Sequence, residues 1–190
     1  MNTNRPRHRL CPWWMACLFD NPLRRLVHSP RKLFGDYLFP GMTAFDIGCG
    51  MGFFSIGMAK IVGEQGRVLA VDLQPRMLAV LNRRAESAGV KHIIDTRQCT
   101  EKRLGIPSGA DFVLLFWSMH EIPDTEALAT EIRDALKPGG FCYVAEPAFH
   151  VSKTALETQI AALSRAGLNQ VTRPRVTFSR AVLLQRQKAG

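Results

Sequence analysis

Thr43–Ser55 reads TAFDIGCGMGFFS, and this stretch decides the fold. A short apolar run of strand length leads into glycines at alternate positions, and apolar residues then recur at roughly helical spacing as far as Val62. Glycine lets a backbone turn sharply, adopt positive φ and admit a ligand to its N–H groups. The pattern of strand, glycine loop and helix therefore predicts a ligand-binding cradle, with a purely structural turn as the alternative.

The order of the glycines separates two classes of nucleotide-type binder. A dinucleotide fingerprint has the order G-x-G-x-x-G/A, whose last residue is small so that the helix can pack against the strand. Here Phe53 stands at that position, and the third glycine comes one residue early. With an acid before the glycines, the stretch resembles the first motif of class I S-adenosylmethionine-dependent methyltransferases, D-x-G-C/T-G-x-G. The resemblance implies a donor-binding loop formed by Asp46, Gly48, Cys49, Gly50 and Gly52.

A second signal is an acidic residue at a characteristic distance after the loop. Val68–Asp72 is predicted to be a strand that ends in a carboxylate, 22 positions after Gly50. An acidic side chain at this place can accept hydrogen bonds from both ribose hydroxyls of a bound nucleoside. We therefore expect Asp72 to hold the ribose and Leu73 to offer an apolar face to the adenine. Met77, in the following helix, is also expected to belong to the donor site.

The segment after the third predicted strand, His92–Arg97, departs from the family pattern. The family often carries a G-D pair there, whose acid contacts the adenine amino group, whereas this chain has Gln98-Cys99-Thr100-Glu101. Cys99 and Thr100 could serve through a backbone amide and a hydroxyl, or Glu101 could reach the adenine. Alternatively, Cys99 is a small packing residue.

Ala110–Trp117 is a nearly continuous hydrophobic run, typical of a strand buried on both faces of a parallel sheet. Ligands of such sheets bind beyond the carboxyl ends of the strands, so Phe116, Trp117 and the loop after them should face donor and acceptor. His120 in that loop is a candidate general base. A structural histidine is the alternative, because His-x-x-Pro-Asp resembles a common loop of the family.

A third signal lies further along the chain. Leu136–Gly140 reads Leu-Lys-Pro-Gly-Gly and again resembles the family, at the turn before its fifth strand. Glu146–His150 follows that predicted strand and is expected to line the acceptor pocket. His150 is therefore a second candidate catalytic residue.

The succession of strands and helices predicts an α/β fold with a doubly wound, mostly parallel sheet and helices on both faces. The resemblance adds seven strands, the last of them antiparallel. Leu168–Val176 and Phe178–Gln185 are the expected closing strands. The 190 residues are expected to form a single domain, with a methyltransferase core at 38–187 and a short N-terminal helical cap at 1–37.

The predicted cap carries two adjacent tryptophans, Trp13 and Trp14, followed by Phe19. These side chains either cover the core or form a lid that shapes an acceptor pocket. The run Leu10–Phe19 imitates a secretory signal, but it lacks a small-residue cleavage site, and we interpret it as mature protein.

Composition limits the function classes. With 46% hydrophobic and 22% charged residues the chain is globular, and no apolar run approaches the ~20 residues that span a bilayer, so no membrane partner is expected. The 5 cysteines include no C-x-x-C, which disfavours a disulfide framework or metal site and favours a cytoplasmic location. The net charge of +9 fits either a solvated surface or an anionic partner such as nucleic acid.

The resemblance, supported by these patterns, implies an S-adenosylmethionine-dependent methyltransferase with a small-molecule acceptor, which the sequence does not identify. An RNA methyltransferase and a non-catalytic donor-binding protein are the alternatives, while Phe53 disfavours an NAD-dependent dehydrogenase. Because the methyl group is already activated on a sulfonium, positioning can supply much of the rate, and a catalytic base is optional. The sequence predicts no oligomeric state.

Overall fold

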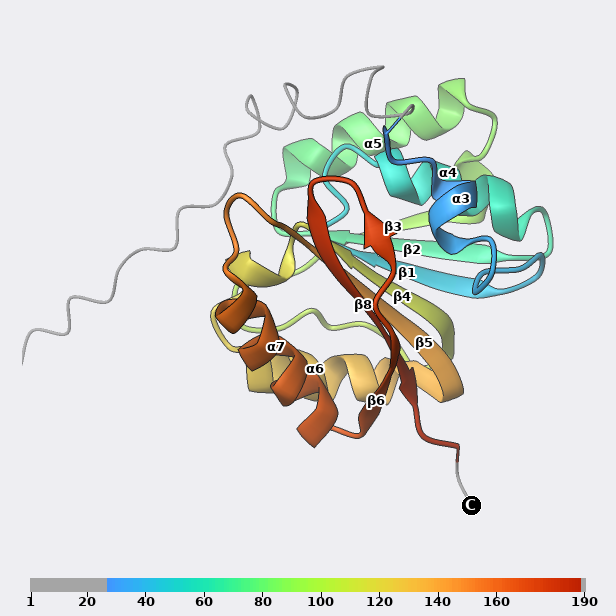
Figure 1. The fold of residues 1–190 in the computed structure, drawn as a ribbon. Helices are drawn as coiled ribbons and strands as arrows, with labels where there is room; N and C mark the ends of the chain where they lie inside the picture. The colour runs from blue at the N-terminus through green and yellow to red at the C-terminus, as the bar shows by residue number, and fades with distance from the viewer. Residues whose placement is uncertain (1–26, 189–190) are drawn as a thin grey trace, which may run out of the picture.

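The computed structural model describes residues 27–188, which form a central sheet with helices on both faces (Figure 1). The strand order is β3-β2-β1-β4-β5-β8-β6, and the short β7 lies off this path and pairs with β8. The strands are β1 (Thr43–Ile47), β2 (Arg67–Asp72), β3 (Ile94–Gln98), β4 (Ala110–Phe116), β5 (Leu136–Pro147), β6 (Leu168–Thr172), β7 (Arg175–Val176) and β8 (Ser179–Arg186).

The sheet contains a reversal in strand order at β1. This strand pairs in parallel with β2 on one side and with β4 on the other, so the chain winds outward from β1 in both directions. The strands from β3 across to β5 are parallel, whereas β8 runs antiparallel between β5 and β6. The predicted doubly wound, mostly parallel sheet is confirmed, and the carboxyl ends of β1 and β4 are where such sheets bind ligands.

Two helical layers bury apolar surface against opposite faces of the sheet (Figure 1). The first layer consists of α3 (Pro30–Phe34), α4 (Phe53–Val62) and α5 (Pro75–Ser87), and the second of α6 (Thr125–Ala135) and α7 (Lys153–Arg165). Successive residues of β4 alternate between the layers, with Phe112 and Leu114 facing the first and Val113 and Leu115 the second. β4 is therefore buried on both sides, as its hydrophobic run predicts.

Side-chain caps begin the two helices of the second layer. The Asp124 carboxylate accepts a backbone N–H of the first turn of α6 at 3.0 Å, and the Ser152 hydroxyl does the same for α7 at 3.1 Å. Two 3-10 turns, η1 (Lys91–Ile93) and η2 (Met119–Glu121), precede β3 and follow β4. The second of these turns carries the loop that the sequence predicts to face the ligands.

Two predicted strands differ in extent from the observed ones. The third strand begins at Ile94 and not at His92, because residues 91–93 turn as η1. The first predicted closing strand, Leu168–Val176, is divided into β6 and β7, and the break contains Pro174, which has no N–H for the ladder. Phe178 lies in the turn before β8 with φ +59°.

β5 is longer than predicted at its start. It includes Lys137–Gly140, which the sequence predicts as a turn before the strand. The pairing with β4 shifts between Ala110 and Phe112, so this segment bulges from the ladder without ending the strand. Gly139 has φ +83° in the bulge, a conformation that favours glycine.

The predicted N-terminal cap is described only from residue 27 onward. Trp13, Trp14 and Phe19 lie outside the described residues, as does the rest of Leu10–Phe19. Within residues 27–188, no helix is long and apolar enough to cross a membrane.

α3 anchors the described end of the cap to the core through one buried ring. The centroid of Phe34 lies 5.5 Å from those of Phe54 and Phe112, and 5.2 Å from that of Tyr143. These rings come from α4, β4 and β5, so Phe34 joins the helical layer to the centre of the sheet. Aromatic pairs of this kind add to the free energy gained by burying the ring itself.

We expect Phe34→Ala to lower the free energy of unfolding by about 3–5 kcal/mol, because it opens a cavity among these rings. Urea denaturation followed by circular dichroism measures the change. Phe39→Ala is the matched control, since Phe39 is 47% exposed, and it should change stability by no more than about 0.5 kcal/mol. Equal losses in the two variants would show that α3 does not anchor the core.

Candidate functional site

The glycine loop lies directly beyond β1 and is tied to the neighbouring strand. The N–H groups of Gly48 and Cys49 both donate to the carbonyl oxygen of Val71 in β2, at 2.8 and 3.0 Å. The N–H of Gly52 donates to the carbonyl of Cys49 at 3.0 Å, which closes the loop before α4 begins. These backbone hydrogen bonds help to hold the loop at the carboxyl edge of the sheet.

The glycines of the loop serve different purposes. A Cβ at Gly48 would lie 2.4 Å from Cβ of Ser118, so this glycine permits close approach of the loop after β4. Gly50 has φ +53°, and a Cβ built there meets no atom within 4 Å, so its free side is open. There is thus open space beside Gly50, while its N–H already donates to Asp72.

Asp72 joins this loop to the end of β2. One carboxylate oxygen accepts the N–H of Gly50 at 2.9 Å, and the other accepts the N–H of Gln74 at 2.8 Å. The side chain is only 8% exposed; burial raises its pKa above the ordinary value, while the N–H donors oppose that shift. Each carboxylate oxygen keeps a second lone pair, so Asp72 can still accept from a ligand hydroxyl.

Asp46 lies beneath the loop. Its buried carboxylate accepts the hydroxyl of Ser55 in α4 at 2.5 Å, which fixes the first turns of that helix against β1. Cys49 is also buried, and burial, followed by the charges of Asp46 and Asp72, raises the pKa of its thiol well above the ordinary value. Burial of this kind favours the neutral thiol of Cys49 over the thiolate.

The remaining residues predicted for the donor site surround the end of β2. Leu73 is half-buried, and Met77 is buried in the first turn of α5. The N–H of Cys99 donates to the Asp72 carbonyl at 3.1 Å, and burial is the main reason that the pKa of its thiol is raised to about 11. Leu73 and Cys99 thus lie beside Asp72, and Met77 lies in the helix that follows.

Thr100 is less available to a ligand than the sequence suggests. Its hydroxyl donates to the carbonyl of Arg103 at 3.2 Å and accepts the N–H of the same residue at 3.1 Å. The hydroxyl proton is therefore used within the turn, and Thr100 offers a ligand at most an acceptor. Glu101 is exposed.

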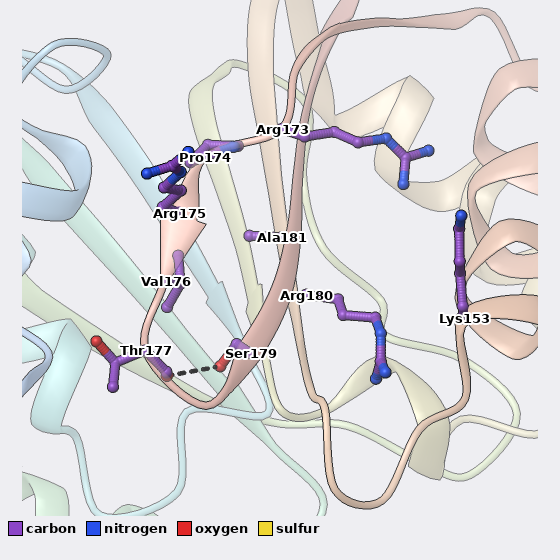
Figure 2. A pocket seen from close by; sticks show the side chains of 9 residues that line it. All are labelled: Lys153, Arg173, Pro174, Arg175, Val176, Thr177, Ser179, Arg180 and Ala181. Atoms are coloured by element: carbon purple, nitrogen blue, oxygen red, sulfur yellow. Dashed lines mark hydrogen bonds between the residues drawn. The ribbon is translucent and has the colours of Figure 1, made fainter.

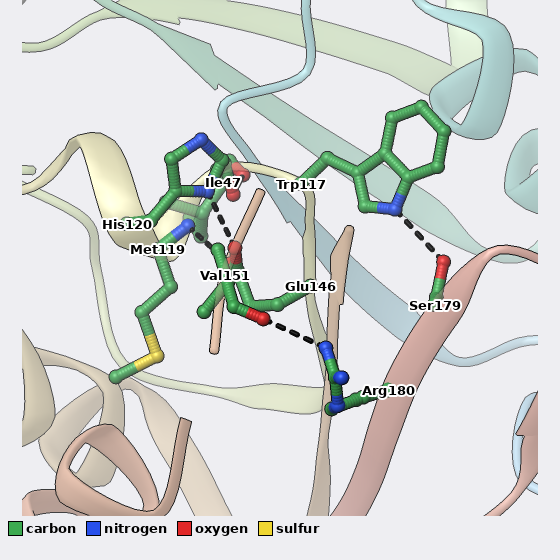
Figure 3. Close-up of polar contacts among 9 residues, drawn as sticks. Ile47, Trp117, Met119, His120, Glu146, Val151, Ser179 and Arg180 are labelled. Atoms are coloured by element: carbon green, nitrogen blue, oxygen red, sulfur yellow. Dashed lines mark hydrogen bonds and ion pairs between the residues drawn. The ribbon is translucent and has the colours of Figure 1, made fainter. Parts of the chain in front are cut away.

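An aromatic cluster closes the other side of the site. Phe116 ends β4 and lies 4.3 Å from Phe54 and 5.6 Å from Trp117, measured between ring centroids. Trp117 has φ +60°, and its indole N–H donates to the hydroxyl of Ser179 at 2.8 Å, as Figure 3 shows. A non-glycine residue at this φ is strained, and such residues concentrate at functional sites.

His120 is held by a buried carboxylate at the end of β5. Its Nδ1–H donates to one oxygen of Glu146, and the other oxygen accepts the N–H of Met119 at 2.9 Å (Figure 3). Glu146 is completely buried, whereas the imidazole remains partly exposed. The His150 ring is centred 5.0 Å away, so both predicted histidines lie together beyond β4 and β5.

The electrostatics of His120 favour a proton-accepting role. Burial lowers the pKa of His120, but the hydrogen bond and charge of Glu146, with the charge of Glu121, raise it above the ordinary value overall. A carboxylate on Nδ1 fixes the tautomer that leaves Nε2 as the acceptor of a proton. The arrangement of base and orienting acid is one that acid–base catalysis uses.

The sequence predicts that Glu146 lies at the acceptor pocket, but it does not predict the hydrogen bond between Glu146 and His120. His28 was also missed: its Nε2 lies 2.9 Å from the carbonyl oxygen of Thr177, and its ring meets those of Phe116 and Trp117 edge-on. The first joins segments that are far apart in the sequence, so it carries no local signal. No local pattern marks the second.

Within the described part of the chain, no three histidine, cysteine or acidic side chains are grouped so that they could hold a metal ion.

A family model described as "Methyltransferase domain" matches residues 44–140, which span the glycine loop, Asp72 and the loop after β4. The chain belongs to this family, and its fold is that of the class I S-adenosylmethionine-dependent methyltransferases.

The chain is similar to demethylmenaquinone methyltransferases. One from Desulfitobacterium hafniense is 32% identical over 102 residues, which cover 53% of this chain and 40% of the relative. Another, from Bacillus cereus, is 29% identical over 102 residues, which cover 43% of that relative. The match thus spans less than half the length of these relatives.

Solved structures extend the likeness of fold. An S-adenosylmethionine-dependent methyltransferase from Aquifex aeolicus superposes with a TM-score of 0.82 at 22% identity, covering 93% of this chain and 99% of that one. The cyclase SpnF superposes with a TM-score of 0.69 at 17% identity, covering 87% and 82%. At these identities the likeness establishes the fold alone, and the second example shows that one fold carries different reactions.

We expect Asp72→Asn to weaken S-adenosylmethionine binding about tenfold or more, because charge-assisted hydrogen bonds contribute about 1.5–3 kcal/mol each. The amide also places an N–H₂ group against one of the two backbone donors that the carboxylate now satisfies. Titration calorimetry measures the dissociation constant.

Asp95→Asn is the matched control, since Asp95 is an exposed acid on the neighbouring strand β3. The Asp95→Asn variant should bind S-adenosylmethionine as tightly as the unchanged protein does. Unaltered binding by Asp72→Asn, or an equal loss in both variants, would refute the assignment of the ribose contact to Asp72.

Proposed function

We propose that this protein transfers the methyl group of S-adenosylmethionine to a nucleophile on a small-molecule acceptor. The observation that carries the proposal is the hydrogen bond between the Gly50 N–H and the Asp72 carboxylate. It joins an open glycine cradle to a buried ribose acceptor at the switch point of the sheet. Membership of the methyltransferase family supports the same reading.

The residues present fit this donor. The open side of Gly50 admits the methionine end of the molecule to the loop, and Asp72 retains lone pairs for the ribose hydroxyls. Leu73 and Met77 supply the apolar surroundings that an adenine ring requires, with the Cys99–Thr100 turn at its edge. We assign Asp46 to supporting the loop from below.

The acceptor side is assigned to the ends of β4 and β5. S-adenosylmethionine supplies an electrophilic methyl group, and the protein's part is to aim a nucleophile at it and to exclude water. His120, oriented by Glu146, takes a proton at Nε2 from an acceptor O–H or N–H as the acceptor atom bonds to the methyl carbon, while the carbon–sulfur bond breaks and the demethylated donor leaves as a thioether. His150 lies beside it as a second polar group of the pocket.

Aromatic side chains favour a small acceptor over a polymer. Phe149 is 69% exposed, and its ring meets Trp117 edge-on with centroids 5.9 Å apart. Such a surface suits a partly apolar, planar molecule. The relatives' name, demethylmenaquinone methyltransferase, denotes a small-molecule acceptor for those proteins and supports the same class here.

Titration calorimetry with S-adenosylmethionine, its demethylated product and NAD is the first test. We expect micromolar binding of the two adenosyl compounds, on the order of 8 kcal/mol, and none of NAD. Small-molecule fractions are then screened for an increase in mass by one methyl group. Failure to bind either adenosyl compound would refute the proposal, whereas binding without turnover on any small molecule would favour a donor-binding protein or an RNA methyltransferase.

His120→Gln should lower kcat about 100-fold while leaving the donor affinity unchanged, as expected for loss of a general base. In the unchanged protein the rate should rise with pH as His120 loses its proton, and because its pKa is raised, that rise should lie above the range of an ordinary histidine. The variant should lack this rise. Stopped assays across the pH range measure both effects.

His92→Gln is the control for that experiment. His92 is an exposed histidine that also contacts a carboxylate, Glu64 at 2.7 Å, but it lies in η1, before β3. Its kcat and pH profile should match those of the unchanged protein. If His120→Gln keeps the full rate and the same pH profile, His120 is a structural residue.

A further inference from the structure

A pocket that is largely open to solvent lies between the β7–β8 hairpin and the start of α7, with a volume of about 530 Å³ (Figure 2). We call it the cationic cavity, because its lining includes Lys153, Arg173, Arg175 and Arg180. None of the described residues that line it is acidic. In Figure 2, Lys153, Arg173 and Arg180 lie on the side of the hairpin toward α7, and Arg175 lies on the other side.

The positive charge of the cavity is only partly compensated. Arg173 forms a two-pronged ion pair with Glu157, at 2.7 and 2.8 Å. Arg180 donates instead to two uncharged groups, the carbonyl oxygens of Ala148 at 2.8 Å and Val151 at 2.7 Å. Among residues 27–188, no carboxylate lies within ion-pair distance of Lys153, Arg175 or Arg180. The cavity therefore keeps an excess of cations.

The position of Lys153 adds to this excess. It is the first residue of α7, and the first turn of that helix contains no acidic side chain. The helix dipole is positive at this end, so a lysine there is unfavourable by itself, and the nearby anion that already interacts with it is Glu157, one turn further along α7. The local sequence thus runs against the usual charge pattern of a helix, at a place where a cavity opens.

We propose that the cationic cavity binds an oxyanion, a phosphate or carboxylate group. Its volume lies within the range of small-molecule sites, about 300–1,000 Å³. Guanidinium and ammonium groups are the side chains that recognise phosphate and carboxylate, through charge-assisted hydrogen bonds. The Lys153 ammonium and the positive end of α7 hold the anion from one side, and the hairpin arginines hold it from the other.

The cavity adjoins the proposed acceptor site through Arg180. This residue pairs in register with Glu146 across β5 and β8, and its guanidinium fastens the loop 148–151 that carries His150. An oxyanion in the cavity is therefore either a group carried by the acceptor or a separate ion beside it. Only the first of these sources rests on the proposed function, since binding of the anion itself needs no methyl transfer.

The test is a titration of the full chain with inorganic phosphate at constant ionic strength, followed by the arginine side-chain N–H signals in NMR spectra. We expect saturable binding, with the shifts concentrated on Arg180 and Arg173. Lys153→Gln should raise the dissociation constant about tenfold, and Lys153→Arg should restore it. Lys60→Gln is the matched control, since Lys60 is an exposed helical lysine on α4, and it should bind as the unchanged protein does.

Three results would overturn the proposal. Equal weakening by Lys153→Gln and Lys60→Gln would reveal general charge screening and no site. Displacement of phosphate by saturating S-adenosylmethionine would place the anion in the donor loop. Single-stranded RNA that binds through Lys153 with a steep salt dependence, while phosphate alone does not bind, would assign the cavity to nucleic acid.

A second arm distinguishes the two sources of the anion. Phosphate is added to methyl transfer assays with the acceptor found by mass shift. Inhibition that competes with the acceptor would assign the oxyanion to the acceptor molecule, and turnover that phosphate does not reduce would assign it to a separate ion. If the protein binds S-adenosylmethionine but does not bind phosphate, the proposed oxyanion site is refuted and the proposed function is unaffected.

Discussion

Two backbone N–H groups converge on the carboxylate of Asp72, and the geometry of the site depends on this convergence. One comes from Gly50 in the loop after β1, the other from Gln74 before α5, so a single side chain fixes both segments at the carboxyl edge of the sheet. Burial raises the pKa of Asp72, which means that the fold holds a charge where it is costly. A carboxylate so placed is ready to accept ligand hydroxyls with little rearrangement, which is what preorganisation requires.

A second carboxylate repeats this arrangement across the switch point. Glu146 at the end of β5 accepts the N–H of Met119 and orients His120, as Asp72 at the end of β2 accepts the N–H of Gly50. In both cases a buried acid at the end of a parallel strand organises the loop after a neighbouring strand. The first acid organises the proposed donor side and the second the proposed acceptor side, so the strand order itself brings the two halves of the proposed site together.

The sequence predicts the part of this arrangement that is encoded locally. The glycine loop, the acid after β2 and the hydrophobic run of β4 each carry their signal within a few residues, and the fold follows from their order. The pairing of His120 with Glu146 carries none, because it joins residues from different strands through the parallel pairing of β4 with β5. The bulge at Lys137–Gly140 was predicted as a turn for a related reason: proline and glycine mark a break in the ladder without revealing whether the strand resumes.

The spatial distribution of charge is another feature that local sequence patterns do not reveal. The net charge of +9 is scattered along the sequence without a long basic run, which by itself fits a solvated surface. The fold gathers part of it: β8 returns antiparallel beside β5 and brings Arg180 to the loop after that strand, while α7 begins with Lys153 at the same edge. Within the described chain, Glu157 is the only carboxylate that forms an ion pair with the cations of the cationic cavity, and it is bound to Arg173. The other cations repel one another, so each of them raises the electrostatic cost of leaving the cavity without an anion. The antiparallel closing strand thus does more than complete the sheet, since it sets the charge of the surface beside the proposed acceptor site.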